Sequence, residues 1–301
     1  MNIIGHHKER RALKERLEKK QVSQSNLFVG PESVGKRRVA FEWALELVGK
    51  PHFVVSLDQP TPLDIQILEP VRIVRRGVTR KKSIGVEETR AGLRFLQLSP
   101  QEGKYKVLIV DDAHLLTVAS QNMMLKFVEE PEPGAIIILV THERQKIVAT
   151  LLSRLVEMRF GFVPVDSLEQ EGPSLGLTVG DTLPDFFFRL GRPGVLFQAV
   201  ENPKTFQKKK EFLTKLFQIS TLSLRARLTL ADELAKDIPT MIQLFEWFLP
   251  GLYVRTREIK AEEQLKKHLF LLEKLDATLI ELKRSEVQPR LTLEQLFLSL
   301  S

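Results

Sequence analysis

Short apolar runs alternate with longer amphipathic segments along the first half of the chain. The runs that predict buried strands span residues 27–29, 53–55, 107–110 and 135–140. Strands that are apolar on both faces are typical of a parallel sheet covered by helices on both sides. Between the runs, apolar residues recur at helical spacing, which predicts helices over residues 8–20, 37–48, 86–96 and 117–128. The first half is therefore predicted to be an α/β domain.

The pattern changes after residue 160. Residues 163 to about 204 are interrupted by Pro and Gly, whereas residues from 205 onward show long helical periodicity with few breakers. The pattern predicts an α/β domain over residues 1–162, a small helical lid over 163–204 and an all-helical C-terminal domain over 205–301. The apolar stripes of the last part, around Leu213, Trp247, Leu272 and Leu296, exceed what a lone bundle needs, so this part is expected to supply the oligomer contacts.

The composition of the chain excludes several classes of protein. The chain has 301 residues, 45 Lys and Arg against 38 Asp and Glu, and no Cys. The absence of Cys excludes disulfides, thiolate nucleophiles and Cys-ligated zinc. The longest apolar run, 135–140, is far shorter than the ~18 residues that cross a bilayer, and the N-terminus has no apolar run of signal-peptide length. We expect a cytoplasmic protein without a membrane span.

A basic cluster extends from Arg72 to Lys82, with six Lys or Arg residues and no aromatic residue among them. Aromatic side chains are the stacking platforms of single-strand sites, so the cluster is predicted to be a solvated loop or hairpin. A contact with nucleic acid remains the alternative.

The segment Gly30 to Lys36 fits the pattern G-x-x-x-x-G-K, and it follows a predicted strand and precedes a predicted helix. This context suits a phosphate loop, because backbone N–H groups and a helix N-terminus then point at the phosphates. Gly30, Gly35 and Lys36 are the candidate nucleotide-binding residues. The next residue should carry a hydroxyl that holds Mg²⁺, but it is Arg37. An unrelated Gly-rich turn at the start of a helix is the alternative.

Two carboxylates, Asp111 and Asp112, end the predicted strand 107–110. In nucleotide sites a strand of this kind delivers an Asp toward Mg²⁺, which makes Asp111 the metal-side candidate. Asp112 stands where hydrolytic proteins usually carry Glu, and its shorter side chain reaches an attacking water poorly. Thr141, at the end of the following strand, fits a polar residue that senses the γ-phosphate. Simple capping of the next helix by the aspartates is the alternative.

The motifs together, in this order, resemble the subunits of bacterial clamp loaders in the AAA+ superfamily. The resemblance rests on Ile4-Gly5-His6, the loop from Gly30 to Lys36, Asp111-Asp112-Ala113-His114, residues 125–131 and Leu152-Ser153-Arg154. Weaker matches extend it to Gly191-Arg192-Pro193-Gly194 and to residues 290–294. The resemblance implies an AAA+ parallel-sheet domain, a helical lid and a C-terminal helical collar.

Clamp loaders are rings that use ATP to place a sliding clamp on primed DNA. One of their subunit types does not hydrolyse ATP and offers the Arg of a Ser-Arg-Cys motif to the ATP bound by its neighbour. Ser153 and Arg154 match two positions of that motif, and Leu155 replaces the Cys. The resemblance therefore implies that Arg154 is an arginine finger acting in trans, with Ser153 beside it. Without the resemblance, Arg154 would be an ordinary surface arginine.

Several departures from the family bear on cofactors. The four-Cys zinc module of many relatives is impossible here, so no zinc is expected, and no metal ligand is assigned. The lid arginine of hydrolysing relatives aligns with Gly194, while Arg192 lies two residues earlier. Together with Arg37 and Asp112, this predicts no hydrolysis, while binding of ATP or ADP through Lys36 stays open.

The implied partners are the ATPase subunits, a clamp-opening subunit and, through the complex, the sliding clamp and primed DNA. Two other functions remain as alternatives. One is an active ATPase of the same family. The other is a basic DNA-binding protein that uses the cluster from Arg72 to Lys82.

Overall fold

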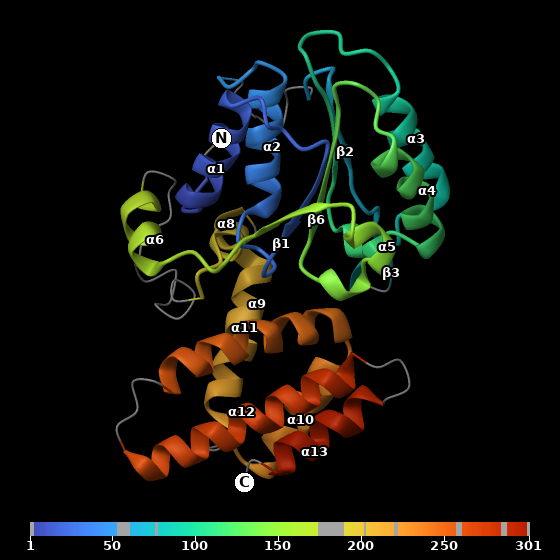
Figure 1. Ribbon diagram of the computed structural model, residues 1–301. Coiled ribbons are helices and arrows are strands. Elements are labelled where there is room, and N and C mark those ends of the chain that lie inside the picture. Colours follow the sequence, from blue (N-terminus) through green and yellow to red (C-terminus); the bar gives the residue numbers. More distant parts are fainter. Residues whose placement is uncertain are drawn as a thin grey trace. The chain divides into compact units, whose positions relative to one another are not determined.

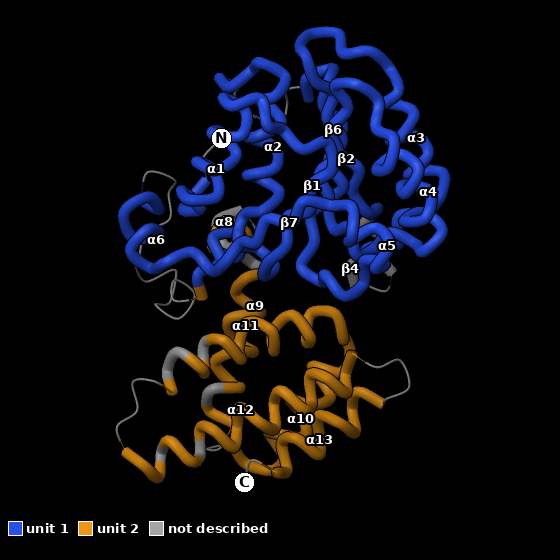
Figure 2. Tube along the Cα trace, in the orientation of Figure 1, with its two compact units in different colours: residues 1–178, 191–195 blue, residues 179–190, 196–301 orange. Residues whose placement is uncertain are grey.

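The computed structural model describes residues 3–52, 61–75, 78–173, 190–201, 203–219, 222–256, 261–283 and 288–299 (Figure 1). The chain forms two compact units (Figure 2). Unit 1 comprises residues 1–178 and 191–195, and unit 2 comprises residues 179–190 and 196–301. The three-part division predicted from the sequence is not tested by these units and stays a prediction.

Unit 1 is built on a five-stranded sheet in which every pair of neighbours is parallel. In spatial order the strands are β2 (Ile65–Leu68), β5 (Lys106–Val110), β6 (Ala135–Thr141), β1 (Ser25–Val29) and β7 (Val156–Arg159). Every residue of the three inner strands is buried. The three apolar runs 27–29, 107–110 and 135–140 are thus confirmed as strands, whereas the run 53–55 lies outside the described residues.

Helices cover both faces of the sheet, as the parallel arrangement requires (Figure 1). On one face α1 (His7–Glu18) and α2 (Lys36–Leu47) pack on alternate strand residues such as Ile136 and Ile138. The other face carries α3 (Val86–Leu96), α4 (Val118–Glu129) and α5 (Ala149–Leu152), which pack on Ile137 and Leu139. The four predicted helices are confirmed as α1 to α4. The predicted cap is also present, because the side chain of Thr117 accepts a hydrogen bond from the backbone N of Ser120.

The basic cluster from Arg72 to Lys82 is a hairpin, one of the two forms that the sequence predicts. Its strands β3 (Arg72–Arg75) and β4 (Val78–Lys81) pair antiparallel in a separate two-stranded sheet. The remaining elements of unit 1 are the 3₁₀ helices η1 (Ala113–Leu115) and η2 (Arg144–Lys146) and the helix α6 (Val165–Glu171).

The described part of unit 2 is built of helices, which confirms the predicted all-α part of the fold. Helix α8 (Pro193–Glu201) begins in unit 1 and continues into unit 2. It is followed by α9 (Pro203–Phe217), α10 (Leu224–Ala235), α11 (Ile238–Thr256), α12 (Glu262–Leu282) and α13 (Pro289–Ser299). Helix α10 packs against α13, and α11 packs against α12.

The apolar stripes of this part are only partly buried within the chain. Leu213, Trp247 and Leu296 are each at most 4% exposed, whereas Leu272 is half-buried. Periodicity shows that a helix has an apolar face but not whether that face meets the same chain or another one, so the expected oligomer contacts stay a prediction. Other side chains, including Tyr253, Leu269 and Ile280, are the large apolar residues that remain exposed.

None of the helices in the described part of the chain has the length and apolar character needed to span a bilayer.

Candidate functional site

The loop from Gly30 to Lys36 connects the end of β1 to the start of α2, where a phosphate loop is expected. Gly35, at the start of α2, has a φ of +111°, a conformation that favours glycine. Gly30 is required for a second reason, since a Cβ atom there would lie 2.2 Å from the backbone O of Phe160. Both glycines are therefore needed for the backbone conformation of the loop, whether or not the loop binds a phosphate.

The side chain of Lys36 turns back onto its own loop. Its Nζ donates hydrogen bonds to the carbonyl oxygens of Gly30, at 2.8 Å, and Pro31, at 2.6 Å. The residue is 5% exposed, and burial lowers the pKa of its ammonium group to about 8. The amine that would bind a phosphate is thus already hydrogen-bonded within the loop.

The lowered pKa of Lys36 predicts that stability rises with alkaline pH. Between pH 8 and 10.5 the unfolded chain keeps the proton on this lysine while the folded chain has lost it. The unfolded state therefore binds more protons, and the free energy of unfolding should rise by about 3 kcal/mol across this range. Urea denaturation of the wild type and of Lys36→Met at several pH values measures the effect as a difference, because all other groups are shared. Parallel pH profiles for the two proteins would contradict it.

The carbonyl groups that follow in the loop are also hydrogen-bonded within unit 1. The pairs are Glu32 O with Nη1 of Arg192 at 3.2 Å, Ser33 O with the backbone N of Gly194 at 2.8 Å, and Val34 O with Nε2 of His6 at 2.8 Å. A Cβ atom on Gly194 would lie 2.8 Å from Ser33 O, so a side chain at this position would push the two segments apart. Glycine thus allows residues 192–194 to lie directly on the loop.

Asp111 lies just beyond the end of β5, where the sequence predicts a metal-side carboxylate, but a cationic side chain stands beside it. Nη1 of Arg37 is 3.3 Å from Oδ2 of Asp111 and 2.7 Å from Oε2 of Glu69. Burial and the adjacent charge of Asp112 raise the pKa of Asp111, while the guanidinium of Arg37 opposes this rise. Arg37 therefore provides at Asp111 the positive charge that a metal ion would otherwise supply.

Asp112 has a left-handed backbone conformation, with φ of +49°, and pairs with a lysine of the hairpin. Its Oδ2 forms an ion pair with Nζ of Lys81. Burial favours the protonated acid, but the charge and hydrogen bond of Lys81, together with the two nearby histidines, outweigh burial and lower the pKa of Asp112. The side chain makes no capping hydrogen bond to η1. The alternative in which the aspartates serve as helix caps therefore does not apply to Asp112.

Thr141 ends β6 and stands next to a pair of histidines. Its Oγ1 accepts a hydrogen bond from the backbone N of Glu143, at 3.0 Å, and lies 3.3 Å from Nδ1 of His114. The rings of His114 and His142 pack edge to face, with their centroids 4.2 Å apart. Burial, with the charge of His142 as the second cause, lowers the pKa of His114 to about 4. Thr141 was predicted from the sequence, whereas the histidine pair was not.

Ser153 and Arg154 follow α5 and precede the edge strand β7. Nη2 of Arg154 is 2.8 Å from Oε1 of Glu129, and Nη1 donates to Thr150 O and to Oγ of Ser153. The first residue of β7 pairs with Asn26, near the beginning of β1, whereas the phosphate loop follows the end of β1. Parallel strands therefore place Arg154 and the chain's own loop at opposite ends of this strand pair.

The predicted residues thus form two groups. Gly30, Gly35, Lys36, Asp111 and Thr141 lie at or just beyond the carboxyl ends of β1, β5 and β6, which are neighbours in the sheet. Ser153 and Arg154 lie at the amino end of β7 and belong to a different part of the surface.

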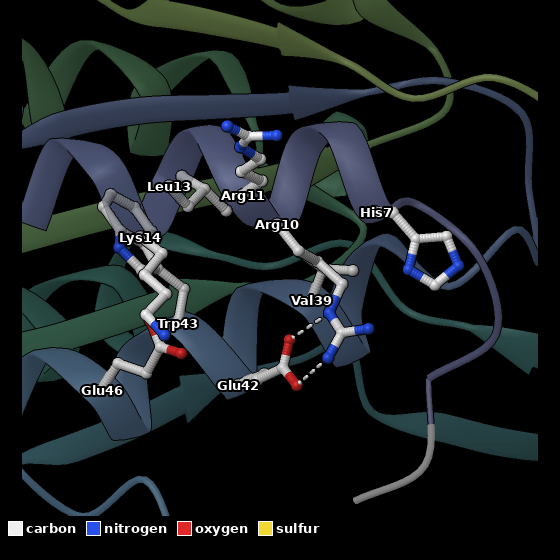
Figure 3. Close-up of a pocket in the computed structure, with 9 residues that line it drawn as sticks. All are labelled: His7, Arg10, Arg11, Leu13, Lys14, Val39, Glu42, Trp43 and Glu46. Atoms are coloured by element: carbon white, nitrogen blue, oxygen red, sulfur yellow. Dashed lines mark hydrogen bonds and ion pairs between the residues drawn. The ribbon is translucent and has the colours of Figure 1, made fainter.

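A separate cavity of about 300 Å³ lies between α1 and α2 (Figure 3). Figure 3 shows Arg10 directed at Glu42, and its Nε and Nη2 atoms are each 2.7 Å from a carboxylate oxygen. The lining consists of His7, Arg10, Arg11, Leu13, Lys14, Val39, Glu42, Trp43 and Glu46. No residue predicted to bind nucleotide is among them, so this cavity is not the nucleotide site.

Comparison with known proteins places these features in a family. The family described as "DNA polymerase III, delta subunit" matches residues 5–163. The subunit delta' of DNA polymerase III from Pseudomonas aeruginosa is 28% identical over 147 residues, which cover 46% of this chain and 43% of that protein. The subunit gamma/tau of Mycobacterium bovis is 29% identical over 188 residues, 56% of this chain and 31% of that protein. The chain thus spans about a third to less than a half of these relatives' length.

Solved structures share the fold at lower sequence identity. A DNA polymerase III gamma subunit-related protein from Thermotoga maritima superposes with a TM-score of 0.52 at 17% identity, covering 96% of this chain and 98% of that one. The RuvB Holliday junction branch migration motor of the same organism gives a TM-score of 0.50 at 14% identity, covering 84% and 88%. At these identities the likeness concerns the fold alone.

Proposed function

The chain belongs to the DNA polymerase III delta subunit family and has an AAA+ fold, and on that premise we propose that it is a non-hydrolysing clamp-loader subunit of the delta-prime type. In this role it helps a clamp-loader complex to place the sliding clamp on primed DNA during replication. It hydrolyses no ATP itself and supplies Arg154 to the ATP site of a neighbouring subunit.

One observation carries the non-hydrolysing part of the proposal, namely the position of the Arg37 guanidinium 3.3 Å from Asp111. Hydrolysis of ATP requires Mg²⁺ bridging the phosphates, held by a hydroxyl of the loop and by this carboxylate. A guanidinium has no lone pair for a metal, and its charge repels one. The internal hydrogen bonds of Lys36 and the shorter side chain of Asp112 support the same conclusion.

The isolated chain is therefore expected to show no ATP turnover above background in the presence of Mg²⁺. Arg37→Thr restores the metal-binding hydroxyl and removes the competing charge, so it should bind Mg·ATP more tightly than the wild type while still failing to hydrolyse it. Phosphate release and fluorescent-nucleotide titration measure the two quantities. A wild-type rate of ~1 per second or more, abolished by Lys36→Ala, would contradict the proposal and favour the active ATPase.

The location of Arg154 supports the trans role. The side chain is 40% exposed and follows a short helix at the amino end of the edge strand, away from the chain's own loop. A planar, permanently charged guanidinium at the surface can reach a phosphoryl group bound by another subunit. Its ion pair with Glu129 holds it in place without burying it.

Unit 2 is proposed to be the collar through which the chain joins its partner subunits. The proposed partners are the ATPase subunits and the clamp-opening subunit, and through them the sliding clamp and primed DNA. Large apolar side chains exposed on unit 2 support this role. They are Leu224, Tyr253, Leu269, Phe270, Ile280, Leu291 and Leu298.

A direct role in DNA binding finds less support. Of the cationic side chains in the hairpin, Lys81 is paired with Asp112. Steep loss of DNA binding by the isolated chain with rising salt would nevertheless favour this function over the proposed one.

A further inference from the structure

Three potential metal ligands meet at the carboxyl ends of the neighbouring strands β5 and β6. They are Asp112 and His114, which flank the start of η1, and His142, which follows Thr141. Each offers one ligand atom, and these atoms all lie within 4.8 Å of one another. Strands β5 and β6 pair with each other along the whole of β5. This pairing fixes the ends of the two strands relative to each other, and the three ligand residues follow those ends directly.

We infer that Asp112, His114 and His142 form a binding site for a single divalent transition-metal ion, with Zn²⁺ as its natural occupant. Two imidazoles and one carboxylate are a ligand set that Zn²⁺ accepts in tetrahedral geometry, with metal–ligand distances of about 2 Å. Mg²⁺ and Ca²⁺ prefer oxygen ligands throughout and are disfavoured by the two imidazoles. The absence of Cys, on which the expectation of no zinc rested, does not bear on a site of this kind.

The ligand atoms lie within 4.8 Å of one another, which is farther apart than ligands at about 2 Å from one ion, so the partly exposed side chains must rotate to bring them together. His142 and Asp112 are 20% and 14% exposed, whereas His114 is 5% exposed. An ion can therefore reach the site from solvent, while the buried His114 provides a fixed ligand.

A fourth ligand is within reach. Oε1 of Glu143 lies 3.8 Å from Nε2 of His114 and 3.6 Å from Nε2 of His142. A single carboxylate oxygen near both rings is suited to complete the coordination or to orient a ring whose other nitrogen binds the ion. The other oxygen of Glu143, Oε2, is paired with Nζ of Lys146 at 2.8 Å, which leaves Oε1 for an ion.

Asp112 keeps one oxygen for an ion. Its Oδ2 is paired with Lys81, but Oδ1 lies 3.9 Å from Nδ1 of His142. Asp111 is not part of the set, so the site is distinct from the magnesium position that Arg37 blocks.

The test is a metal titration of the full-length chain after removal of metal by chelator and dialysis. Co²⁺ serves as the spectroscopic probe, because histidine-bound tetrahedral Co²⁺ absorbs in the visible, and Zn²⁺ should then displace it. We expect one equivalent of Co²⁺ to bind, Zn²⁺ to abolish the absorption at one equivalent, and excess Mg²⁺ to leave it unchanged.

The matched variants are His142→Asn and Asp112→Asn against the control His7→Asn. His7 is an exposed histidine that pairs with Glu171 and lies outside the cluster. Loss of a ligand should weaken binding by about a hundredfold or more, since even outer-shell partners account for 10–100-fold, whereas His7→Asn should bind like the wild type. Circular dichroism confirms that each variant is folded, and either cluster variant suffices. The inference is overturned by an absence of stoichiometric binding, by equal competition from Mg²⁺, or by binding that survives in both cluster variants or is lost in His7→Asn.

Discussion

Replacement of Arg154 by Ala is expected to lower the rate of ATP hydrolysis at the neighbouring subunit's site by about a thousandfold or more, and so to depress the DNA-stimulated ATPase of the complete clamp loader. The guanidinium is proposed to stand beside the transferring phosphoryl group of a neighbour, where an arginine finger typically contributes 10³–10⁵ in rate. The side chain contacts Glu129, Thr150 and Ser153, all at the surface, so its removal should leave folding and assembly intact. Steady-state ATPase assays of the reconstituted complex measure the effect.

Two further variants make this test specific. Arg154→Lys keeps the charge but lacks the planar fork, so it should restore little activity. Arg159→Ala removes an exposed arginine at the other end of β7, one that pairs with Glu157, and it should leave the rate unchanged. An unaltered rate for Arg154→Ala would reduce Arg154 to the ordinary surface arginine that the sequence alone suggests.

Replacement of Asp64 by Ala is expected to lower the free energy of unfolding by about 3–5 kcal/mol. Asp64 is fully buried, and its Oδ1 lies 3.3 Å from Nζ of Lys106, which is itself 2% exposed. The carboxylate also accepts hydrogen bonds from the backbone N atoms of Gln101, Glu102 and Gly103. The variant would leave the Lys106 ammonium buried without its counter-ion and these N–H groups without an acceptor.

Urea denaturation of the full-length chain measures the change at neutral pH. Glu15→Ala, which removes one member of an exposed pair with Arg11, is the control and should change stability by less than about 0.5 kcal/mol. The double variant Asp64→Ala with Lys106→Met should recover part of the loss, because it also removes the uncompensated charge. Equal effects of Asp64→Ala and Glu15→Ala would show that the buried pair is not a major source of stability.

The fold was predictable where the sequence is apolar on both faces of a strand. The inner strands β1, β5 and β6 are entirely buried and appear as continuous apolar runs. The edge strands β2 and β7 were not predicted. In β7 only Met158 is buried, and two of the four residues, Glu157 and Arg159, are charged, so the segment has no apolar run. An edge strand has only one neighbouring strand to shield it from water, so its sequence contains both polar and apolar residues.

The site residues that could be predicted are those that directly follow or end a strand. The rule that carboxyl ends of neighbouring parallel strands meet places Asp111 and Thr141 together, and the same rule applied to His114 and His142 would have found the histidine pair. This rule does not predict the ion pairs around the aspartates. Arg37 pairs with Glu69, just before the hairpin, and Asp112 pairs with Lys81 of the hairpin, and no local sequence pattern indicates that the hairpin region lies against the strand ends.

The position of β1 within the sheet governs how the protein can fold during synthesis. Ser25 pairs with Ile137 and Asn26 pairs with Val156, so both neighbours of β1 are made more than a hundred residues later. At a synthesis rate of about 5–20 residues per second, β1 waits on the order of ten seconds for its partners. Contacts this distant in sequence also close slowly because of the entropy of the intervening loop. The nascent chain therefore leaves an edge of this apolar strand unpaired until β7 has emerged, and at this stage of synthesis aggregation competes with folding.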